Sequence, residues 1–231
     1  SLAAACTQRQ ERLKLMSYNI RNGIGIDNIQ DIGRIARVIL REAPDLVALQ
    51  ELDSATLRVD GRYIPGELGR MTGMHATFGR AIGFAGGSYG VGLLSRTEPF
   101  AVRSIPLPGR EEARVLLMAE FPDYTVCVTH LSLTPEDRHA SLPIIREATD
   151  TCRKPVLLAG DFNTGDAAAV LAGLGGGFRI LSDTTRMTFP ADNPAVRIDY
   201  ILGRGLPTSA TVAESAVDHT AAASDHCPLW V

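Results

Sequence analysis

The spacing of apolar positions changes along this chain, and each spacing predicts a different secondary structure. Apolar runs at residues 13–20 and 45–50 predict two strands, and the segment 27–42 between them has apolar residues at helical spacing. Asp27 is the expected N-cap of this helix. Its apolar face is predicted to consist of Ile32, Ile35, Ala36, Ile39 and Leu40. The chain therefore opens with a strand, a helix and a second strand.

Short strand-like runs dominate the rest of the chain. A second helix is predicted near residues 64–72. Further strands are predicted at residues 76–79, 87–95, 101–105, 114–121, 124–131, 155–159, 197–202, 208–214 and 228–231. Two more helices are predicted, over residues 135–152 with Thr134 as the N-cap and near residues 166–174. So many strands with helices between them indicate two packed sheets covered by helices.

Composition and charge narrow the class of protein. The chain has 231 residues, of which 45% are hydrophobic and 21% charged, without a long Ser/Gly/Pro linker or a repeat of fixed period. Residues 13–231 are therefore expected to form one domain. The formal net charge of -3 argues against a strongly basic nucleic-acid cradle. No stretch approaches the roughly 18 to 20 apolar residues of a membrane-spanning helix, so no transmembrane segment is expected.

Residues 1–12 are interpreted as an N-terminal tail. Small residues precede Cys6, as at the end of a bacterial lipoprotein signal, in which the cysteine becomes lipidated. An Ala-rich end without function is an equally good interpretation. The first interpretation predicts an exported protein that is periplasmic, extracellular or lipid-anchored at Cys6. The second leaves a cytoplasmic location open.

The segment Gly160-Asp161-Phe162-Asn163 is the first candidate for chemistry, because it follows a short apolar run that reads as a buried strand. Open sheets expose ligand-binding groups at the carboxyl ends of their strands. Asp161 and Asn163 are two residues apart, so on an extended segment they project to the same side. Their oxygens are of the kind that bind Mg²⁺. The structural alternative is a turn that ends the strand.

Other polar residues also lie at predicted strand ends. They are Asn19, Glu51, His130, Asp199 and the pair Asp225-His226. Each has a structural explanation by itself, such as a turn asparagine, a solvated acid or a buried histidine with its hydrogen bonds satisfied. Their occurrence in one order along the chain, each beside an apolar run, favours a common site instead.

Together these motifs resemble the endonuclease/exonuclease/phosphatase superfamily, which includes pancreatic-type deoxyribonuclease, neutral sphingomyelinases and inositol polyphosphate phosphatases. The resemblance covers essentially all of residues 13–231. Its carriers are Met16-Ser17-Tyr18-Asn19-Ile20, Leu49-Gln50-Glu51, Gly90-Val91-Gly92-Leu93-Leu94-Ser95-Arg96, Thr129-His130-Leu131, Gly160-Asp161-Phe162-Asn163, Arg197-Ile198-Asp199-Tyr200-Ile201 and Ser224-Asp225-His226. The resemblance implies an α/β, deoxyribonuclease-like fold, a four-layer sandwich of two packed mixed β-sheets flanked by helices.

The resemblance also implies a cofactor and a base. Mg²⁺ is the expected metal, with Mn²⁺ as an alternative, and Glu51, Asn19 and Asp225 are its expected ligands. Phosphate ester hydrolysis needs an activated water and neutralisation of the charge that grows on the phosphoryl oxygens. By similarity, His226 is the general base, held and polarised by Asp199.

The remaining site residues are expected to face the substrate. By the same resemblance, Asp161 and Asn163 orient the water and the phosphate, and Asp161 is also a candidate metal contact. His130 is expected to act as a phosphate-oxygen donor or general acid. Arg114 resembles an arginine that contacts phosphate in several family members, and a solvated strand-edge arginine is a nearly equal alternative.

The sequence thus predicts a Mg²⁺-dependent phosphoesterase that acts on a phosphodiester or phosphomonoester by in-line attack of an activated water. Its substrate is expected to be a phosphorylated small molecule, a lipid headgroup or a nucleic acid, and the protein is expected to be a monomer. One alternative is a nonspecific extracellular nuclease, which requires a basic face built from Arg103, Arg110, Arg114 and Arg138. Another is a catalytically silent binding module, which predicts loss of at least one of Glu51, Asp161 and His226, and none of them is lost.

Overall fold

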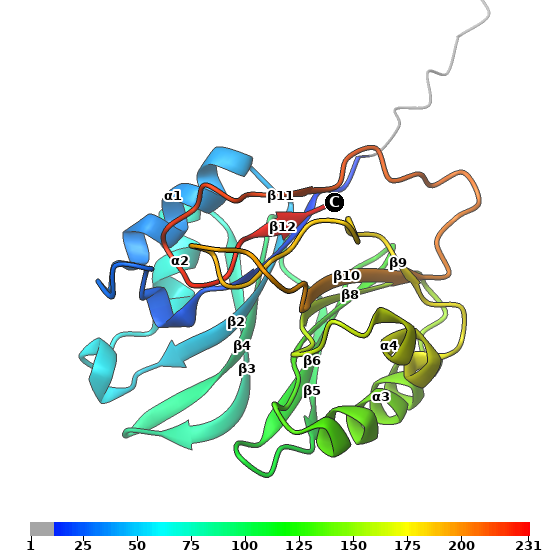
Figure 1. The fold of residues 1–231 in the computed structure, drawn as a ribbon, viewed down its shortest axis with the longest axis horizontal. Helices are drawn as coiled ribbons and strands as arrows, with labels where there is room; N and C mark the ends of the chain where they lie inside the picture. Colours follow the sequence, from blue (N-terminus) through cyan, green and yellow to red (C-terminus); the bar gives the residue numbers. More distant parts are fainter. Residues whose placement is uncertain (1–11) are drawn as a thin grey trace, which may run out of the picture.

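Two six-stranded sheets form the centre of the structure, a computed structural model that describes residues 12–231 (Figure 1). The strands of the first sheet are β1 (Leu15–Asn19), β2 (Leu46–Ser54), β3 (His75–Phe84), β4 (Gly87–Ser95), β11 (Ala216–Val217) and β12 (Leu229–Trp230). The strands of the second sheet are β5 (Ala101–Leu107), β6 (Arg114–Glu120), β7 (Thr125–His130), β8 (Val156–Asp161), β9 (Arg179–Ile180) and β10 (Asp199–Arg204). The helices are α1 (Ile32–Glu42), α2 (Ile64–Thr72), α3 (Pro135–Asp150) and α4 (Ala167–Leu174), with 3-10 turns η1 (Arg21–Gly23) and η2 (Leu57–Val59).

Both sheets are mixed. The first has the order β11-β12-β1-β2-β4-β3 and the second the order β5-β6-β7-β8-β10-β9. In each sheet one neighbouring pair is parallel, β1 with β2 and β7 with β8, and the other neighbours are antiparallel. Helices α1 and α2 lie beside the first sheet, and α3 and α4 lie beside the second (Figure 1). The predicted four-layer α/β sandwich is therefore confirmed.

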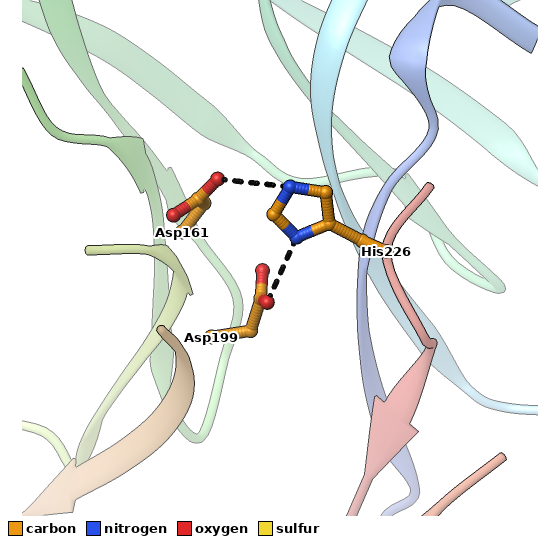
Figure 2. A group of neighbouring side chains, drawn as sticks. All are labelled: Asp161, Asp199 and His226. Atoms are coloured by element: carbon orange, nitrogen blue, oxygen red, sulfur yellow. Dashed lines mark hydrogen bonds and ion pairs between the residues drawn. The ribbon is translucent and has the colours of Figure 1, made fainter. Parts of the chain in front are cut away.

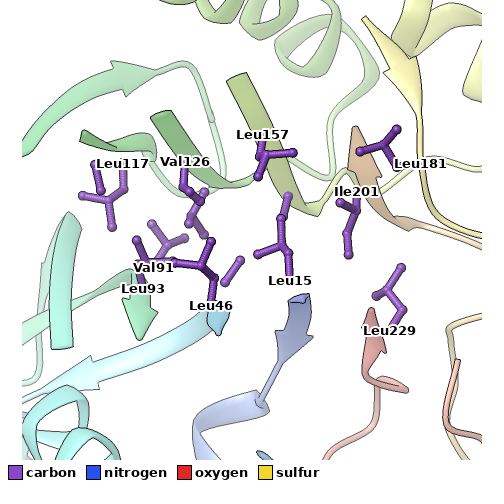
Figure 3. Packing of buried hydrophobic residues seen from close by; sticks show 14 of the residues in the cluster. Leu15, Leu46, Val91, Leu93, Leu117, Val126, Leu157, Leu181, Ile201 and Leu229 are labelled. Atoms are coloured by element: carbon purple, nitrogen blue, oxygen red, sulfur yellow. The ribbon is translucent and has the colours of Figure 1, made fainter. Parts of the chain in front are cut away.

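The main core lies between the two sheets (Figure 3). Leu15 and Leu46 come from the first sheet and meet Val126 and Leu157 of the second, and all four are buried. Separate apolar clusters join each sheet to its own helices. Because both faces of the central strands are covered, these strands are apolar almost without alternation, as is usual for sheets buried on both sides. Their side chains nevertheless alternate between the inner core and the helix layer.

The first helix is shorter than predicted. It begins at Ile32, and its N-cap is Asp31, whose side chain accepts a hydrogen bond from the Arg34 N–H. The prediction of Asp27 as N-cap is wrong, because the Asp27 carboxylate instead pairs with the Arg34 guanidinium and caps a turn before the helix. Leu40 was also placed wrongly on the apolar face, since it is 53% exposed.

The C-terminal third of the chain also differs from the predicted secondary structure. The strand predicted over residues 208–214 is wrong: that segment is irregular and mostly exposed, and a two-residue strand, β11, forms just after it. The short strand β9 was not predicted. The other predicted helices and strands are confirmed with shifts of a few residues at their ends.

The tail prediction falls almost wholly outside the described residues, and so does its candidate lipid anchor, Cys6. Within residues 12–231, none of the helices has the length and apolar character needed to span a membrane. The assignment of residues 13–231 to one domain stays a prediction.

Candidate active site

The inner faces of the sheets end in polar side chains at one edge of the sandwich. In β8, Ala159 belongs to the core between the sheets, and Asp161, two residues further, points to the same face. The same step leads from Val128 to His130 in β7. Strand pairing places His130 beside Asp161, and Asp161 beside Asp199 of β10. Three adjacent strands thus present a histidine and two carboxylates in one row.

Asn19 connects this row to the first sheet. It lies at the end of β1, on the same face as Leu15 of the central core. Its Nδ2 donates to Glu51 Oε1 at 3.0 Å and to Asp161 Oδ2 at 3.1 Å, and its Oδ1 accepts from the Arg21 N–H at 3.1 Å. The amide therefore bridges two carboxylates with its donor side.

Glu51 reaches the site through a break in the pleat of β2. Strict alternation would place Glu51 on the helix side, opposite Ala48 of the inner core. The pairing of β2 with β4 shifts register between Leu49 and Leu52, and Glu51 itself has φ 55°, in the left-handed region. This bulge turns the carboxylate towards Asn19.

Asp225 and His226 come from the segment that leads into β12. The Ser224 hydroxyl donates to the backbone carbonyl of Asn19 at 2.6 Å, which ties this segment to the end of β1. The Asp225 carboxylate lies 3.7 Å from the Arg21 guanidinium and is about one third exposed, whereas His226 is buried. The last strand thereby completes the edge that β1 began.

His226 lies between two carboxylates (Figure 2). Its Nδ1 is 2.9 Å from Asp199 Oδ2, and its Nε2 is 3.6 Å from Asp161 Oδ2. The Thr188 hydroxyl donates to the same Asp199 oxygen at 2.6 Å and so holds it in place. Burial lowers the pKa of His226, but the charges of Asp199, Asp161 and Asp225 outweigh burial and raise this pKa to about 10. The ring therefore attracts a proton strongly.

Asp161 is the central carboxylate of the group. Burial and the neighbouring charge of Asp199 raise its pKa to about 7, while His226 acts in the opposite direction. Asn163, with φ 50°, donates its backbone N–H to Asp161 Oδ1 at 2.9 Å. The Asn163 side chain donates to the Leu131 carbonyl at 2.7 Å. Asn163 thus orients Asp161 and links it to the loop after β7.

His130 has a different environment. Its Nε2 lies 3.4 Å from Asp161 Oδ2, and its Nδ1 lies 3.2 Å from an Arg114 Nη1. Burial and the positive charge of Arg114 hold the pKa of His130 well below its ordinary value. Arg114 is itself buried and pairs with Glu111 and Glu112. Its predicted contact with substrate phosphate stays a prediction.

The donor set fits a divalent cation. Burial and the charge of nearby Asp225 raise the pKa of Glu51, although the Asn19 hydrogen bond and the charges of His226 and Arg114 act in the opposite direction. A cation bound at this carboxylate would stabilise its ionised form further. Ligand atoms of Asp161, Asp199 and His226 also lie within 4.8 Å of one another and could hold a metal ion. We regard that trio first as a hydrogen-bonded group, because both ring nitrogens of His226 already face carboxylates. Asp199 Oδ1 is buried without a hydrogen-bond partner among residues 12–231.

The arginines proposed for a basic face are engaged within the chain. Arg110 pairs with Asp137, and Arg138 donates to backbone carbonyls of the loop after β7. Arg103 donates to the C-terminal end of α3, and Arg114 is buried. These contacts do not support the extended free basic surface that a nonspecific nuclease needs.

Two polar residues that hold the site were missed from the sequence. Thr188 positions Asp199, and Glu111 accepts hydrogen bonds from Arg114 and from the loop after β7. Both lie in loops, away from the strand ends at which the predicted site residues stand. The segment Thr188-Phe189-Pro190 precedes the Asp199 strand in the sequence, but its residue types do not indicate a contact with Asp199.

Comparisons with known proteins agree on the fold. A sequence profile of the Endonuclease/Exonuclease/phosphatase family matches residues 16–226. A search of curated protein sequences gives no match. An endonuclease/exonuclease/phosphatase from Beutenbergia cavernae DSM 12333 is similar in structure, with a TM-score of 0.74, 24% identity, and coverage of 94% of this chain and 70% of that chain.

Two further solved structures match over nearly their whole length. An endonuclease/exonuclease/phosphatase family protein from Leptotrichia buccalis C-1013-b has a TM-score of 0.73 and 19% identity, and the match covers 95% of this chain and 98% of that chain. A mannosyl-6-phosphatase from Bacteroides thetaiotaomicron VPI-5482 has a TM-score of 0.70 and 17% identity, with the same coverage of 95% and 98%. At these identities the structural likeness supports the fold only.

Proposed function

The chain belongs to the endonuclease/exonuclease/phosphatase family, and from this premise we propose that it is a Mg²⁺-dependent phosphoesterase. It hydrolyses a phosphodiester or phosphomonoester by in-line attack of an activated water. The observation that carries the proposal is the buried group in which His226 lies between Asp199 and Asp161, next to the carboxylate of Glu51. A base, its orienting acid and an excess of buried oxygen ligands are what metal-assisted phosphoryl transfer needs.

The proton chemistry is assigned to His226. Because Nδ1 donates to Asp199, the other nitrogen, Nε2, is the one that takes a proton from the attacking water. Without a cation nearby, the surrounding carboxylates hold the His226 pKa at about 10, so the ring is already protonated at neutral pH. Glu51, Asn19 and Asp225 would hold the cation, whose charge would offset that of Asp225 and bring the His226 pKa closer to the operating pH.

The metal ligands are proposed to be Glu51, Asn19 and Asp225. A bound Mg²⁺, or Mn²⁺ as an alternative, supplies neutralisation of the charge that grows on the phosphoryl oxygens. In the structure, Asp225 pairs at 3.7 Å with Arg21, a cation that the metal would displace or accompany. Asn19 now presents its Nδ2 to the carboxylates, so ligation by its Oδ1 requires a rotation of the amide.

The phosphate is proposed to lie between Asn163 and His130, above Asp161. Asp161 accepts a hydrogen bond from Asn19, and this contact fixes its position relative to the metal ligands. The ionised Asp161 carboxylate can accept a hydrogen bond from the water, and because its pKa is raised to about 7, its protonated form can donate one to a phosphoryl oxygen. His130, held by Arg114 and 3.4 Å from Asp161, contributes an N–H donor to the phosphate.

The first experiment measures hydrolysis of bis-p-nitrophenyl phosphate by the purified protein. We expect turnover with Mg²⁺ or Mn²⁺, complete loss with EDTA, and recovery when the metal is restored in excess. Equal rates with and without metal would contradict the metal assignment. Binding without turnover of every phosphoester tested would favour the silent binding module.

The substrate class needs a parallel screen. DNA, RNA, sphingomyelin, inositol phosphates and sugar phosphates are each incubated with the protein and Mg²⁺, and released phosphate or cleaved product is measured. Sugar phosphates are included because a protein of similar fold is a mannosyl-6-phosphatase. The contacts of Arg103, Arg110 and Arg138 within the chain lower the expectation for long nucleic acids. DNA or RNA as the best substrate would revive the nuclease alternative.

A further inference from the structure

A carboxylate outside the predicted site connects the loop before β6 to the loop after β7. Glu111 accepts hydrogen bonds from the Ser132 hydroxyl at 2.7 and 2.8 Å, from the Leu133 N–H at 2.8 Å and from the Thr134 hydroxyl at 3.1 Å. Thr134 is the N-cap residue of α3, yet its side chain makes no cap hydrogen bond to that helix. The hydroxyl that ordinarily caps a helix is used here to hold Glu111.

The same carboxylate holds Arg114. Arg114 Nη2 lies 3.1 Å from Glu111 Oε1, and Arg114 Nη1 lies 3.2 Å from Glu112 Oε2. The arginine is only 6% exposed, so its guanidinium has little freedom to choose other partners. Nη1 points as well to Nδ1 of His130, at 3.2 Å. Glu111 therefore contacts both Arg114, the partner of His130, and the three residues that follow Leu131.

The hydrogen bond between Arg114 and His130 determines which ring nitrogen of the histidine carries the proton. A guanidinium carries donors and no acceptor, so Nδ1 of His130 must accept the hydrogen bond. A ring that accepts at Nδ1 carries its proton on Nε2. Nε2 lies 3.4 Å from Asp161 Oδ2, on the side where a phosphoryl oxygen is proposed to lie.

We propose that Glu111 is a positioning residue: through Arg114 it holds His130 as the neutral imidazole with its proton on Nε2, ready to donate a hydrogen bond to the substrate. This inference rests on the proposed phosphoesterase function. It also narrows the role of His130, which donates a hydrogen bond to a phosphoryl oxygen and keeps its proton. His130 is thereby distinguished from a general acid, which would have to lose that proton to the leaving group.

A matched control is Asp137 in the first turn of α3, which holds Arg110 of the same loop. Arg110 donates its backbone N–H and its guanidinium to Asp137, a second ionic connection between the β5–β6 loop and α3. Asp137 has no contact with Arg114 or His130 among the interactions of the described residues. Asp137→Asn therefore weakens the attachment of the loop, as Glu111→Gln does, without touching the chain from Glu111 to His130.

The test reads the histidine directly, by ¹⁵N NMR of protein labelled at histidine, with and without Mg²⁺. His130→Gln identifies the His130 signals by their absence. In the wild type and in Asp137→Asn we expect Nδ1 unprotonated and Nε2 protonated. In Glu111→Gln we expect a second population with the proton on Nδ1. A wild-type His130 protonated at Nδ1, or an unchanged proton position in Glu111→Gln, would overturn the inference.

Turnover of bis-p-nitrophenyl phosphate gives an independent readout. We expect Glu111→Gln to lower kcat by about tenfold with little change in KM, because a displaced donor chiefly affects the transition state. Asp137→Asn should keep the wild-type kcat. Equal losses in both variants would show a merely structural role. If Glu111→Gln does not fold, Glu111→Asp is measured instead, since its carboxylate is one methylene too short to reach both Ser132 and Arg114.

The two proposals fail separately. In one outcome, the His130 proton moves from Nε2 to Nδ1 in Glu111→Gln, but the wild type hydrolyses no phosphoester. This outcome would support the chain of contacts from Glu111 to His130 and reject the enzymatic function. Hydrolysis by the wild type with no effect of Glu111→Gln on kcat or on the proton would retain the function and reject the role of Glu111.

Discussion

Two histidines lie near the same carboxylate oxygen, and the charged group behind each ring differs in sign. His226 Nε2 lies 3.6 Å and His130 Nε2 lies 3.4 Å from Asp161 Oδ2, and both rings are buried. The far nitrogen of His226 faces the carboxylate of Asp199, whereas that of His130 faces the guanidinium of Arg114. The pKa of His226 is therefore raised, and that of His130 is lowered.

This difference shows that the partner of Nδ1, rather than the position at a strand end, decides what each ring can do. With an acid behind it, His226 gains basicity and can take a proton from water. With an arginine behind it, His130 remains neutral and can only offer an N–H. The pair thus resembles other sites in which neighbouring titratable groups have pKa values that are pushed apart and take separate roles.

The largest expected effect is at His226. His226→Gln removes the group that accepts the proton and should lower kcat by roughly 10² to 10⁴, because a glutamine amide cannot act as a base. His226→Ala should lose about as much. Turnover of bis-p-nitrophenyl phosphate is measured, with His219→Gln as a control, since His219 is exposed and contacts the Met187 carbonyl. An unchanged kcat in a folded His226→Gln protein would contradict the assignment of His226 as the general base.

The same substitution should be milder at His130. Gln retains an N–H donor, so His130→Gln should preserve at least about tenfold more activity than His130→Ala, which loses a phosphate donor worth roughly 10² to 10³ in kcat. The four variants at the two histidines are assayed side by side. If His130→Gln is as inactive as His130→Ala, while His226 shows the same pattern, the two rings cannot be told apart by role and the comparison is wrong.

The smallest effect concerns stability against pH. Burial raises the pKa of Glu111, but hydrogen bonds from Ser132, the backbone and Arg114 outweigh it and lower this pKa to about 2, from an ordinary 4.5. A lowered pKa stabilises the folded state above pH 4.5, and that stabilisation is lost as the pH falls towards 2. The urea midpoint of the wild type should therefore exceed that of Glu111→Gln at pH 6, and the two should converge near pH 2.

In metal-free protein, His226 makes folding stability depend on pH in the opposite direction. Its raised pKa stabilises the folded state fully below its ordinary value of 6.5, and this contribution is lost as the pH rises through about 10. The midpoint difference between wild type and His226→Gln should therefore shrink on the alkaline side, where that of Glu111→Gln stays constant. If the midpoint differences of the two variants changed with pH in the same direction, the opposite directions of the Glu111 and His226 pKa shifts would be contradicted.

Most helices and strands followed from local pattern, and so did the set of polar residues at strand ends, whose roles stay predictions from the family resemblance. Alternation along β7 and β8 correctly sends His130 and Asp161 to the inner face, because the two-residue period of a strand depends on nothing outside it. Errors arose where several local solutions compete. Asp27 and Asp31 are both good N-caps, and the choice was made by the Arg34 guanidinium, which binds Asp27 and leaves Asp31 to the helix.

Glu51 illustrates a limit of pattern arguments. The sequence singled out this residue, but alternation would have turned its side chain to the wrong face of β2. Its left-handed φ of 55° and the shifted pairing with β4 correct the direction, and the pairing depends on a strand more than thirty residues further along the chain. The reach to Asn19 is thus a property of the assembled sheet.

The sequence by itself determined which residues end the buried strands, and therefore which acids, amides and histidines could meet at one edge of the sandwich. The family resemblance already paired His226 with Asp199, and only the tertiary structure decided the other partners. Whether a histidine faces Asp199 or Arg114 depends on loops and neighbouring strands distant in sequence, and that choice sets the sign of its pKa shift. The reason is physical: strand periodicity is local, whereas the electric field and the burial that govern proton affinity are summed over every neighbour in space.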